Sequence, residues 1–136
     1  MLLSLSVSYS QNRPSLRERA ENGDAEAQFN LGKNYEAGRG GLKRDYAEAA
    51  NWYRRSAEQG DAYAQASLGI LYRFGKGVPQ DSTQAYMWFS LAASQTTGGE
   101  QETIAEMRES AASHMTSEQI KEGQRLVREW KPKPRQ

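Results

Sequence analysis

The chain has 136 residues, with 18 lysine and arginine residues against 17 aspartate and glutamate residues, a net charge of +1 and no cysteine. This length suits a single domain of about 100 to 150 residues, and the balanced charge excludes long-range attraction to nucleic acid or to an anionic membrane. The lack of cysteine excludes disulfide bonds, thiolate metal sites and a cysteine nucleophile, while leaving the cellular compartment undetermined.

Residues 1–14 begin with apolar residues that alternate with serine, a pattern typical of a half-buried strand. A signal peptide needs a basic region followed by about 7 to 15 continuous apolar residues, and the segment has neither. We therefore expect a flexible leader, with the remnant of an export signal or a packed arm as alternatives. No other stretch approaches the ~20 apolar residues of a membrane span, so membrane insertion is not expected.

The chain contains an internal repeat of 36 to 37 residues. The stretch GDAEAQFNLGKNYEAGRG at residues 23–40 returns without a gap as GDAYAQASLGILYRFGKG at residues 60–77. A period of about 20 to 50 residues is the mark of stacked-repeat architectures. We assign repeat one to residues 23–59 and repeat two to residues 60–95, preceded by a half-unit at residues 15–22, where RERAENGD echoes RRSAEQGD.

The first half of each repeat predicts an amphipathic helix. Apolar residues recur three and four positions apart, as a helix with one buried face requires. Asp24 and Asp61 stand where an acidic side chain caps the first turn. Gly38 and Gly75 stand where a left-handed residue closes the helix.

The second half of each repeat predicts a second helix. Asp45 with Glu48, and Asp81 with Gln84, form an acidic variant of the capping box at its start. The loops that join the two helices are too short for anything but an antiparallel return. Each repeat is thus expected to be a hairpin of antiparallel helices.

Gly32 and Gly69 lie inside the first helix, where glycine costs about 1 kcal/mol relative to alanine. A repeated glycine at such a position favours close approach of another helix. We expect an aromatic side chain of the second helix, Trp52 in repeat one or Trp88 in repeat two, to lie over the position that lacks a side chain.

Two diverged helices are predicted over residues 99–130, the first with Ile104 on its apolar stripe and the second opening on a capping box at Thr116. They have the character of the atypical cap that ends a repeat array. Residues 131–136 contain two prolines and are expected to fray as a basic extended tail. The predicted fold is an all-α solenoid of antiparallel helical hairpins over residues 15–130.

The run G-D-A-x-A-Q-x-x-L-G-x-x-Y-x-x-G-x-G, followed by an aspartate and an A-x-x-W-[YF] pattern, closely resembles the Sel1-like repeat, a relative of the tetratricopeptide repeat. The resemblance covers residues 23–95. It implies a right-handed α/α superhelix and a protein-binding adaptor, often in bacteria. One branch of the family staples its repeats with disulfides. This chain lacks those cysteines, so the penicillin or β-lactam binding suggested for that branch does not carry over.

No catalytic residue, metal-ligand set or cofactor site is predicted. The glycine-rich loops GRGG and GKGV lack both the preceding strand and the G-x-x-x-x-G-K-[ST] spacing of a phosphate-binding loop. His114 is the only histidine, whereas a zinc site usually has three or four protein ligands. The serines of the predicted helices have no histidine to activate them.

The exposed side of the first helices is the candidate binding surface, since in solenoids of this kind these helices line the concave side. The candidates for partner contact are Phe29, Asn30, Lys33, Ile70 and Arg73. Phe29 and Ile70 are apolar at positions where the helical pattern predicts exposure to solvent. They either pack against the neighbouring hairpin or anchor a bound peptide.

The sequence therefore predicts a non-enzymatic adaptor that presents a concave helical groove to a protein or peptide partner. Two alternatives stay open. An enzyme or small-ligand binder acting on cell-envelope material would need a pair of carboxylates with perturbed acidity in a pocket. A structural component would self-associate through the open end of the stack. We expect a monomer or weak self-association, and no nucleic-acid partner.

Overall fold

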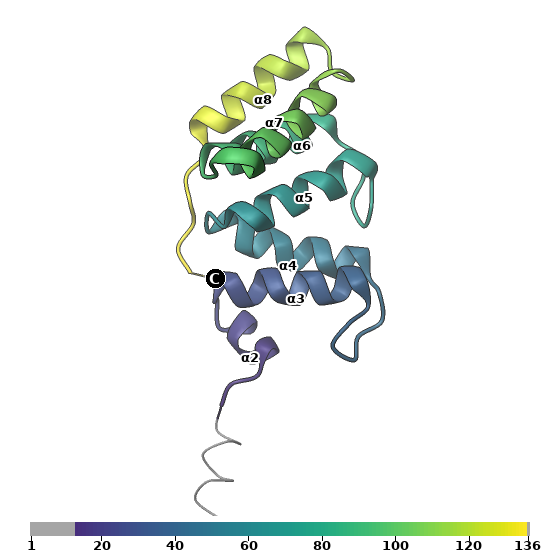
Figure 1. The fold of residues 1–136 in the computed structure, drawn as a ribbon, viewed down its shortest axis with the longest axis vertical. Coiled ribbons are helices and arrows are strands. Elements are labelled where there is room, and N and C mark those ends of the chain that lie inside the picture. The colour runs from purple at the N-terminus through teal and green to yellow at the C-terminus, as the bar shows by residue number, and fades with distance from the viewer. Residues whose placement is uncertain (1–12, 136) are drawn as a thin grey trace, which may run out of the picture.

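The computed structural model describes residues 13–135, so the predicted leader lies outside the described residues except at its end. Within the described range the chain forms seven helices and no strand, which confirms the predicted all-α class. The helices are α2 (Leu16–Glu21), α3 (Ala25–Ala37), α4 (Tyr46–Glu58), α5 (Ala62–Phe74), α6 (Ser82–Ser94), α7 (Gly98–Ala112) and α8 (Ser117–Glu129). Figure 1 shows them stacked in chain order as a solenoid, from α2 at one end to α8 at the other. None of these helices has both the length and the apolar character needed to cross a bilayer.

The helix ends follow the predicted capping residues. Four aspartates each accept a hydrogen bond from the backbone amide three residues further along: Asp24, Asp45, Asp61 and Asp81. Gly38 and Gly75 are left-handed just past α3 and α5, with φ angles of 67° and 65°. A full capping box opens α8 at Thr116. These local signals fix where each hairpin begins and turns.

The glycines inside α3 and α5 are covered by aromatic rings, but not by the tryptophans. A Cβ atom added at Gly32 would lie 2.6 Å from Tyr53 Cδ1, and one added at Gly69 would lie 2.6 Å from Phe89 Cε1. The prediction that a tryptophan covers the glycine is therefore wrong by one position. Neighbouring helical residues point about 100° apart, and in α4 and α6 it is the residue after the tryptophan that faces the other helix of the hairpin.

Trp52 and Trp88 pack instead where successive units meet. Trp52 forms a buried cluster with Ala20, Ala27 and Leu31. Trp88 belongs to another buried cluster, which contains the corresponding residues one repeat later: Ala57, Ala64 and Leu68. The two indoles are 7% and 3% exposed. Small side chains at the boundary thus make room for one indole per repeat, as close packing of the interior requires.

Buried glutamines tie successive units together, a role that the sequence alone did not reveal. Gln28 and Gln65 are fully buried, and each donates a hydrogen bond to the carbonyl of the residue eight positions earlier, at 3.0 and 3.2 Å. Gln59 and Gln95 in turn donate to the side-chain oxygens of Gln28 and Gln65, at 2.8 and 2.7 Å. The same polar link therefore recurs one repeat later, and it satisfies groups that would be costly to bury alone.

The prediction that the C-terminal tail frays is wrong. After α8 the chain is extended and runs back along one side of the stack (Figure 1). The Lys133 backbone amide donates to the Glu58 carbonyl at 2.7 Å, and Lys133 Nζ lies 3.1 Å from Glu58 Oε2. Arg135 Nε donates to the Asn22 carbonyl at 2.9 Å. The tail thus joins the capping end of the solenoid to the turns that precede α3 and α5.

Candidate functional site

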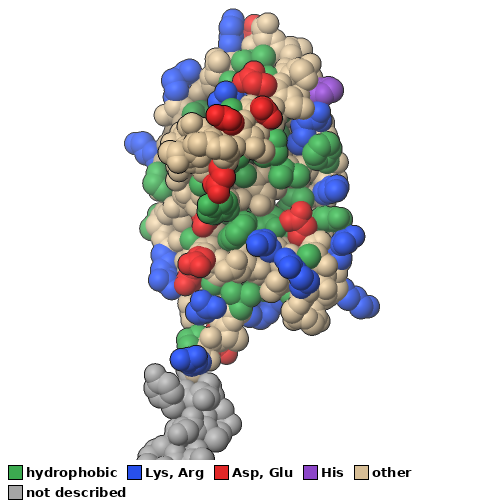
Figure 2. Space-filling view, in the orientation of Figure 1, with side chains coloured by type: hydrophobic (Ala, Val, Ile, Leu, Met, Phe, Trp, Pro, Cys, Tyr) green, Lys and Arg blue, Asp and Glu red, His purple; other side chains and the backbone are tan. Residues whose placement is uncertain are grey.

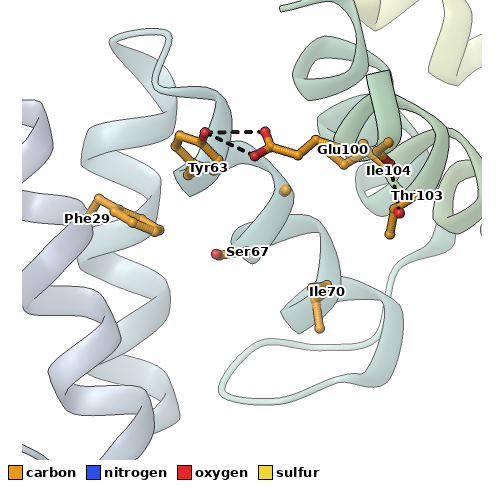
Figure 3. A pocket seen from close by; sticks show the side chains of 9 residues that line it. Phe29, Tyr63, Ser67, Ile70, Glu100, Thr103 and Ile104 are labelled. Atoms are coloured by element: carbon orange, nitrogen blue, oxygen red, sulfur yellow. Dashed lines mark hydrogen bonds between the residues drawn. The ribbon is translucent and has the colours of Figure 1, made fainter. Parts of the chain in front are cut away.

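An open groove of about 580 Å³ crosses the face formed by α3, α5 and α7. Its lining is mainly apolar and includes Phe29, Tyr63, Ser67, Ile70, Glu100, Thr103 and Ile104. Figure 3 shows these side chains on the three helices around the groove. We call it the concave groove.

The groove exists because the first helices of successive units do not pack on one another. α3 packs on α4 and α7 packs on α6, whereas α5 packs on both α4 and α6. The floor over α5 is low, since Ala66 and Ser67 are small. Two fixed walls and a low floor make a preformed site, as binding pockets usually are.

The wall on α3 is a rigid aromatic surface. The ring of Phe29 lies 5.8 Å from that of Tyr53 and 6.1 Å from that of Tyr63, measured between centroids. Tyr53 is fully buried and donates its hydroxyl to Glu36. Burial and then this acceptor raise the pKa of Tyr53 well above its ordinary value. Lys33 Nζ lies 5.4 Å from the centroid of Phe29, within reach of a cation–π contact.

One end of the groove is bridged by Tyr63 and Glu100. The Tyr63 hydroxyl lies 3.2 and 3.5 Å from the two carboxylate oxygens of Glu100, and Figure 3 shows the pair reaching from α5 to α7. The charge of Glu100, followed by its acceptance of this hydrogen bond, raises the pKa of Tyr63. Tyr63 nevertheless remains 54% exposed, so its ring is available to a partner.

A second, smaller hollow continues the groove toward the C-terminal end of α5. It lies between α5 and α7 and shares Ile70 with the concave groove. Phe74 lines it and is 63% exposed. Arg73 also lines it, with its guanidinium carbon 5.2 Å from the centroid of Phe74. Over residues 13–135, no acceptor is found for the buried Arg73 Nε.

The structure brings only some of the predicted contact residues together. Phe29 and Ile70 line the concave groove, and Arg73 lines the hollow beside it. Lys33 stands over Phe29 at the edge of the groove. Asn30 is half-buried on α3 and does not line the groove.

The sequence prediction missed the wall that α7 supplies. Glu100 and Thr103 were not considered, and Ile104 was assigned only to an apolar stripe of a terminal cap. Tyr63 was also missed, although a signal was present: it stands where repeat one has Glu26, an aromatic residue at an exposed helical position.

The described residues hold no group of three or more histidine, cysteine, aspartate or glutamate side chains placed to bind a metal. Glu100 is the carboxylate that lines the concave groove. His114 lies exposed after the end of α7, and not in the groove. What the groove offers is apolar surface with a charge at its rim, which is suited to holding a side chain of another molecule.

The charges around this face are not evenly spread. Figure 2 shows acidic side chains following one another down the middle of the face, and basic side chains gathered at the lower right, on the side of the loops that close the hairpins. Hydrophobic side chains lie between them. A partner would therefore meet an apolar surface with acidic side chains along its middle and basic side chains at its margin.

The family model of the Sel1 repeat matches residues 25–61 and 62–96, which together make up more than half of the chain. A comparison with curated proteins found no match.

Two solved structures have similar folds. One is the crystal structure of a protective antigen of uropathogenic Escherichia coli with an SLR fold, 34% identical, with a TM-score of 0.76 over 85% of this chain and 24% of that one. The other is a Sel1 repeat protein from Oxalobacter formigenes, 40% identical, with a TM-score of 0.58 over 60% of this chain and 33% of that one. The chain thus spans about a quarter and a third of these neighbours. Both come from bacteria, as the resemblance in sequence implied for this chain.

Proposed function

The chain belongs to the Sel1 repeat family, and on this basis we propose that it is a non-enzymatic adaptor whose concave groove binds a protein or peptide partner. Sel1 repeats commonly serve as scaffolds for protein interaction. The specific partner surface proposed here comprises Phe29, Lys33, Ile70 and Arg73, together with the α7 wall.

The observation that carries the proposal is the exposure of large apolar side chains at one place. Isolated exposed apolar residues are ordinary on protein surfaces, but a contiguous exposed patch in a groove usually marks an interaction site. Tyr63 is 54% exposed at one end of the groove and Phe74 is 63% exposed beyond the other. Phe29 and Ile70 are half-buried and line the same groove. The rest of the large apolar residues described here are buried or half-buried.

The test combines a charge reversal with the loss of an apolar anchor. The double variant Lys33→Glu with Ile70→Asp would be compared with wild type in affinity capture from the native host, followed by crosslinking at the groove. A matched control is Lys121→Glu with Gln124→Asp on α8, because it changes the net charge by the same amount at exposed residues. Circular dichroism would establish that each variant is folded.

We expect the groove variant to lose the partners that wild type and the α8 control retain. Unchanged capture by a folded groove variant would contradict the proposal. Partners lost equally by both variants would indicate a general effect of charge and not a role for the groove.

A further inference from the structure

The concave groove and the hollow beside it form one continuous valley between α5 and α7. They share Ile70, and α5 runs along the valley from Tyr63 to Phe74. At a rise of about 1.5 Å per residue, this length of α5 is about 16 Å. These two end residues are also the exposed large hydrophobic side chains of the described chain. The valley therefore offers a long apolar track with an aromatic contact at each end.

The chemistry of the track favours a helix over an extended peptide. An extended segment brings backbone N–H and C=O groups that must find partners when they are covered. The track offers few hydrogen-bonding partners, since Thr103 already donates its hydroxyl to the Gly99 carbonyl. The other side chains along it are mainly apolar, among them Ile70, Ile104 and Met107. A helix satisfies its own backbone and needs only an apolar face, with anchors about three and four residues apart. A track of about 16 Å accommodates about three helical turns.

The two ends of the valley carry opposite charges that form no ion pair within residues 13–135. Glu100, at the Tyr63 end, accepts a hydrogen bond from Tyr63, and no lysine or arginine of the described chain pairs with it. Arg73, at the Phe74 end, likewise forms no ion pair within residues 13–135. Charge complementarity at an interface fixes orientation and excludes wrong partners.

We propose that the α5–α7 valley binds an amphipathic helix of about three turns that carries a basic residue at the end over Glu100 and an acidic residue at the end over Arg73. This inference rests on the proposed interaction function and adds the conformation and charge order of the partner segment. The partner's apolar face packs on Ile70 and Ile104, and its ends contact Tyr63 and Phe74.

The internal repeat supplies variants that are compatible with the fold. Ile70 occupies the position that Lys33 holds in α3, and Tyr63 the position of Glu26. α3 is a helix of the same length with the same caps. Ile70→Lys and Tyr63→Glu therefore give α5 the side chains that α3 already carries at the equivalent positions. Since Ile70 also packs against the buried cluster that contains Phe89 and Ile104, the Tm of each variant is measured to separate loss of binding from loss of folding.

The probe is a synthetic, fluorescein-labelled amphipathic peptide of about 12 residues. It has leucine at helical positions i, i+3, i+4 and i+7, lysine at one end and glutamate at the other, and binding is followed by fluorescence anisotropy. A second peptide has two central prolines, which prevent a helix. A third has glutamine in place of both charges. The full chain is used throughout, with Glu118→Gln on α8 as the charge control.

The helical peptide is expected to bind, and Ile70→Lys should weaken it by about tenfold, as the loss of one buried anchor does. Glu100→Gln and Arg73→Gln should each weaken the charged peptide by about threefold, as expected for an exposed ion pair. Neither should affect the peptide without charges, and Glu118→Gln should affect none of them.

Three results would overturn the inference. The first is equal binding of the proline peptide, which would make the occupant extended. The second is failure of the helical peptide to bind, or binding insensitive to Glu100→Gln and Arg73→Gln. The third is a dimer in light scattering that Ile70→Lys dissociates, which would make the occupant a second copy of the chain. If partner capture still depends on Lys33 and Ile70 in any of these cases, the interaction function stands and only the helical occupant is refuted.

Discussion

Removal of the C-terminal tail should loosen a turn that lies more than one hundred residues earlier in the chain. In a solenoid each unit contacts only its neighbours, and the helix packing of this chain follows that rule. The tail is an exception, since Lys133 contacts Glu58 and Arg135 contacts Asn22, 113 residues away. A chain that ends after Trp130 would lose both links, which leaves α2 held by its packing on α3 and repeat one held by the packing of α4 on α5.

The size of the effect follows from the interactions that the tail makes. The backbone hydrogen bond from Lys133 contributes about 1 kcal/mol and the guanidinium hydrogen bond from Arg135 about 1.5 kcal/mol. The exposed ion pair between Lys133 and Glu58 adds about 0.5 kcal/mol. Ordering the tail offsets part of this sum, although its two prolines have little backbone freedom to lose. We expect a net loss of about 1 to 2 kcal/mol, or a fall in Tm of about 4 to 8 °C.

Two measurements check this expectation. Calorimetry would give the change in Tm, and hydrogen exchange would show faster exchange at the amides of Gly23 and Gly60, in the turns that the tail covers. Arg135→Ala should give about half of the loss and affect Gly23 more than Gly60. Lys131→Ala should change nothing, because no hydrogen bond or ion pair is found for Lys131 within residues 13–135. A truncated chain with unchanged Tm and unchanged exchange at both turns would refute the reasoning.

Four further substitutions test stability: three change buried residues, and one is a control on the surface of α7. Gly69→Ala should destabilise the protein by about 1 to 3 kcal/mol in urea unfolding, because its Cβ would collide with the buried ring of Phe89, whereas Gly99→Ala, which meets open space on α7, should raise stability by about 0.5 kcal/mol. Gln65→Leu should cost about 1 to 3 kcal/mol in the same assay, because it removes two buried hydrogen bonds, from Gln65 to the Ala57 carbonyl and from Gln95 to Gln65. Burial raises the pKa of Tyr53, so this phenol ionises at a lower pH in the unfolded chain than in the folded one. The stabilisation that comes from its neutral form is therefore complete below about pH 10 and is lost as the pH rises further. Tyr53→Phe should therefore show a shallower loss of unfolding free energy between about pH 9 and pH 11, and an identical slope in the two proteins would contradict this origin of the alkaline instability.

The caps and the repeat could be predicted from sequence because each is a local signal. An aspartate three residues before a free amide, or a glycine just past a helix, produces its effect within one turn. Local signals could not decide whether Trp52 or Tyr53 covers Gly32, since the two residues are both aromatic, adjacent and buried. Only the rotation of α4 against α3 decides between them. The contact of Lys133 with Glu58 was hidden for a different reason, because a basic proline-rich tail has the same composition whether or not it is docked.

How much of the groove could be predicted also depended on whether its residues lie in the repeat. Its α3 wall and its α5 floor lie in the repeat, and Phe29 and Ile70 were found there as apolar residues at positions where the helical pattern predicts solvent. Its α7 wall lies in a helix that has lost the repeat pattern, so Ile104 could be assigned to an apolar stripe but not to a site. Glu100 could not be found at all, because a glutamate in the first turn of a helix is equally well explained by the helix dipole.

A comparison of the two repeats indicates why the valley lies beside α5 and not beside α3. The two helices share four buried positions, as Leu31 and Leu68 show, and α5 adds a fifth at Leu71. Three other positions differ in character between the two helices. At those three positions α3 carries Glu26, Lys33 and Ala37, and α5 carries tyrosine, isoleucine and phenylalanine in their place. Tyr63 and Phe74 are exposed and carry a risk of aggregation, whereas Ile70 is half-buried and packs against the cluster that contains Phe89 and Ile104. The two exposed aromatic residues of α5 are therefore best explained by a partner that covers this helix, and Tyr63→Glu with Phe74→Ala, which gives α5 the residues of α3, should leave Tm unchanged while weakening peptide binding.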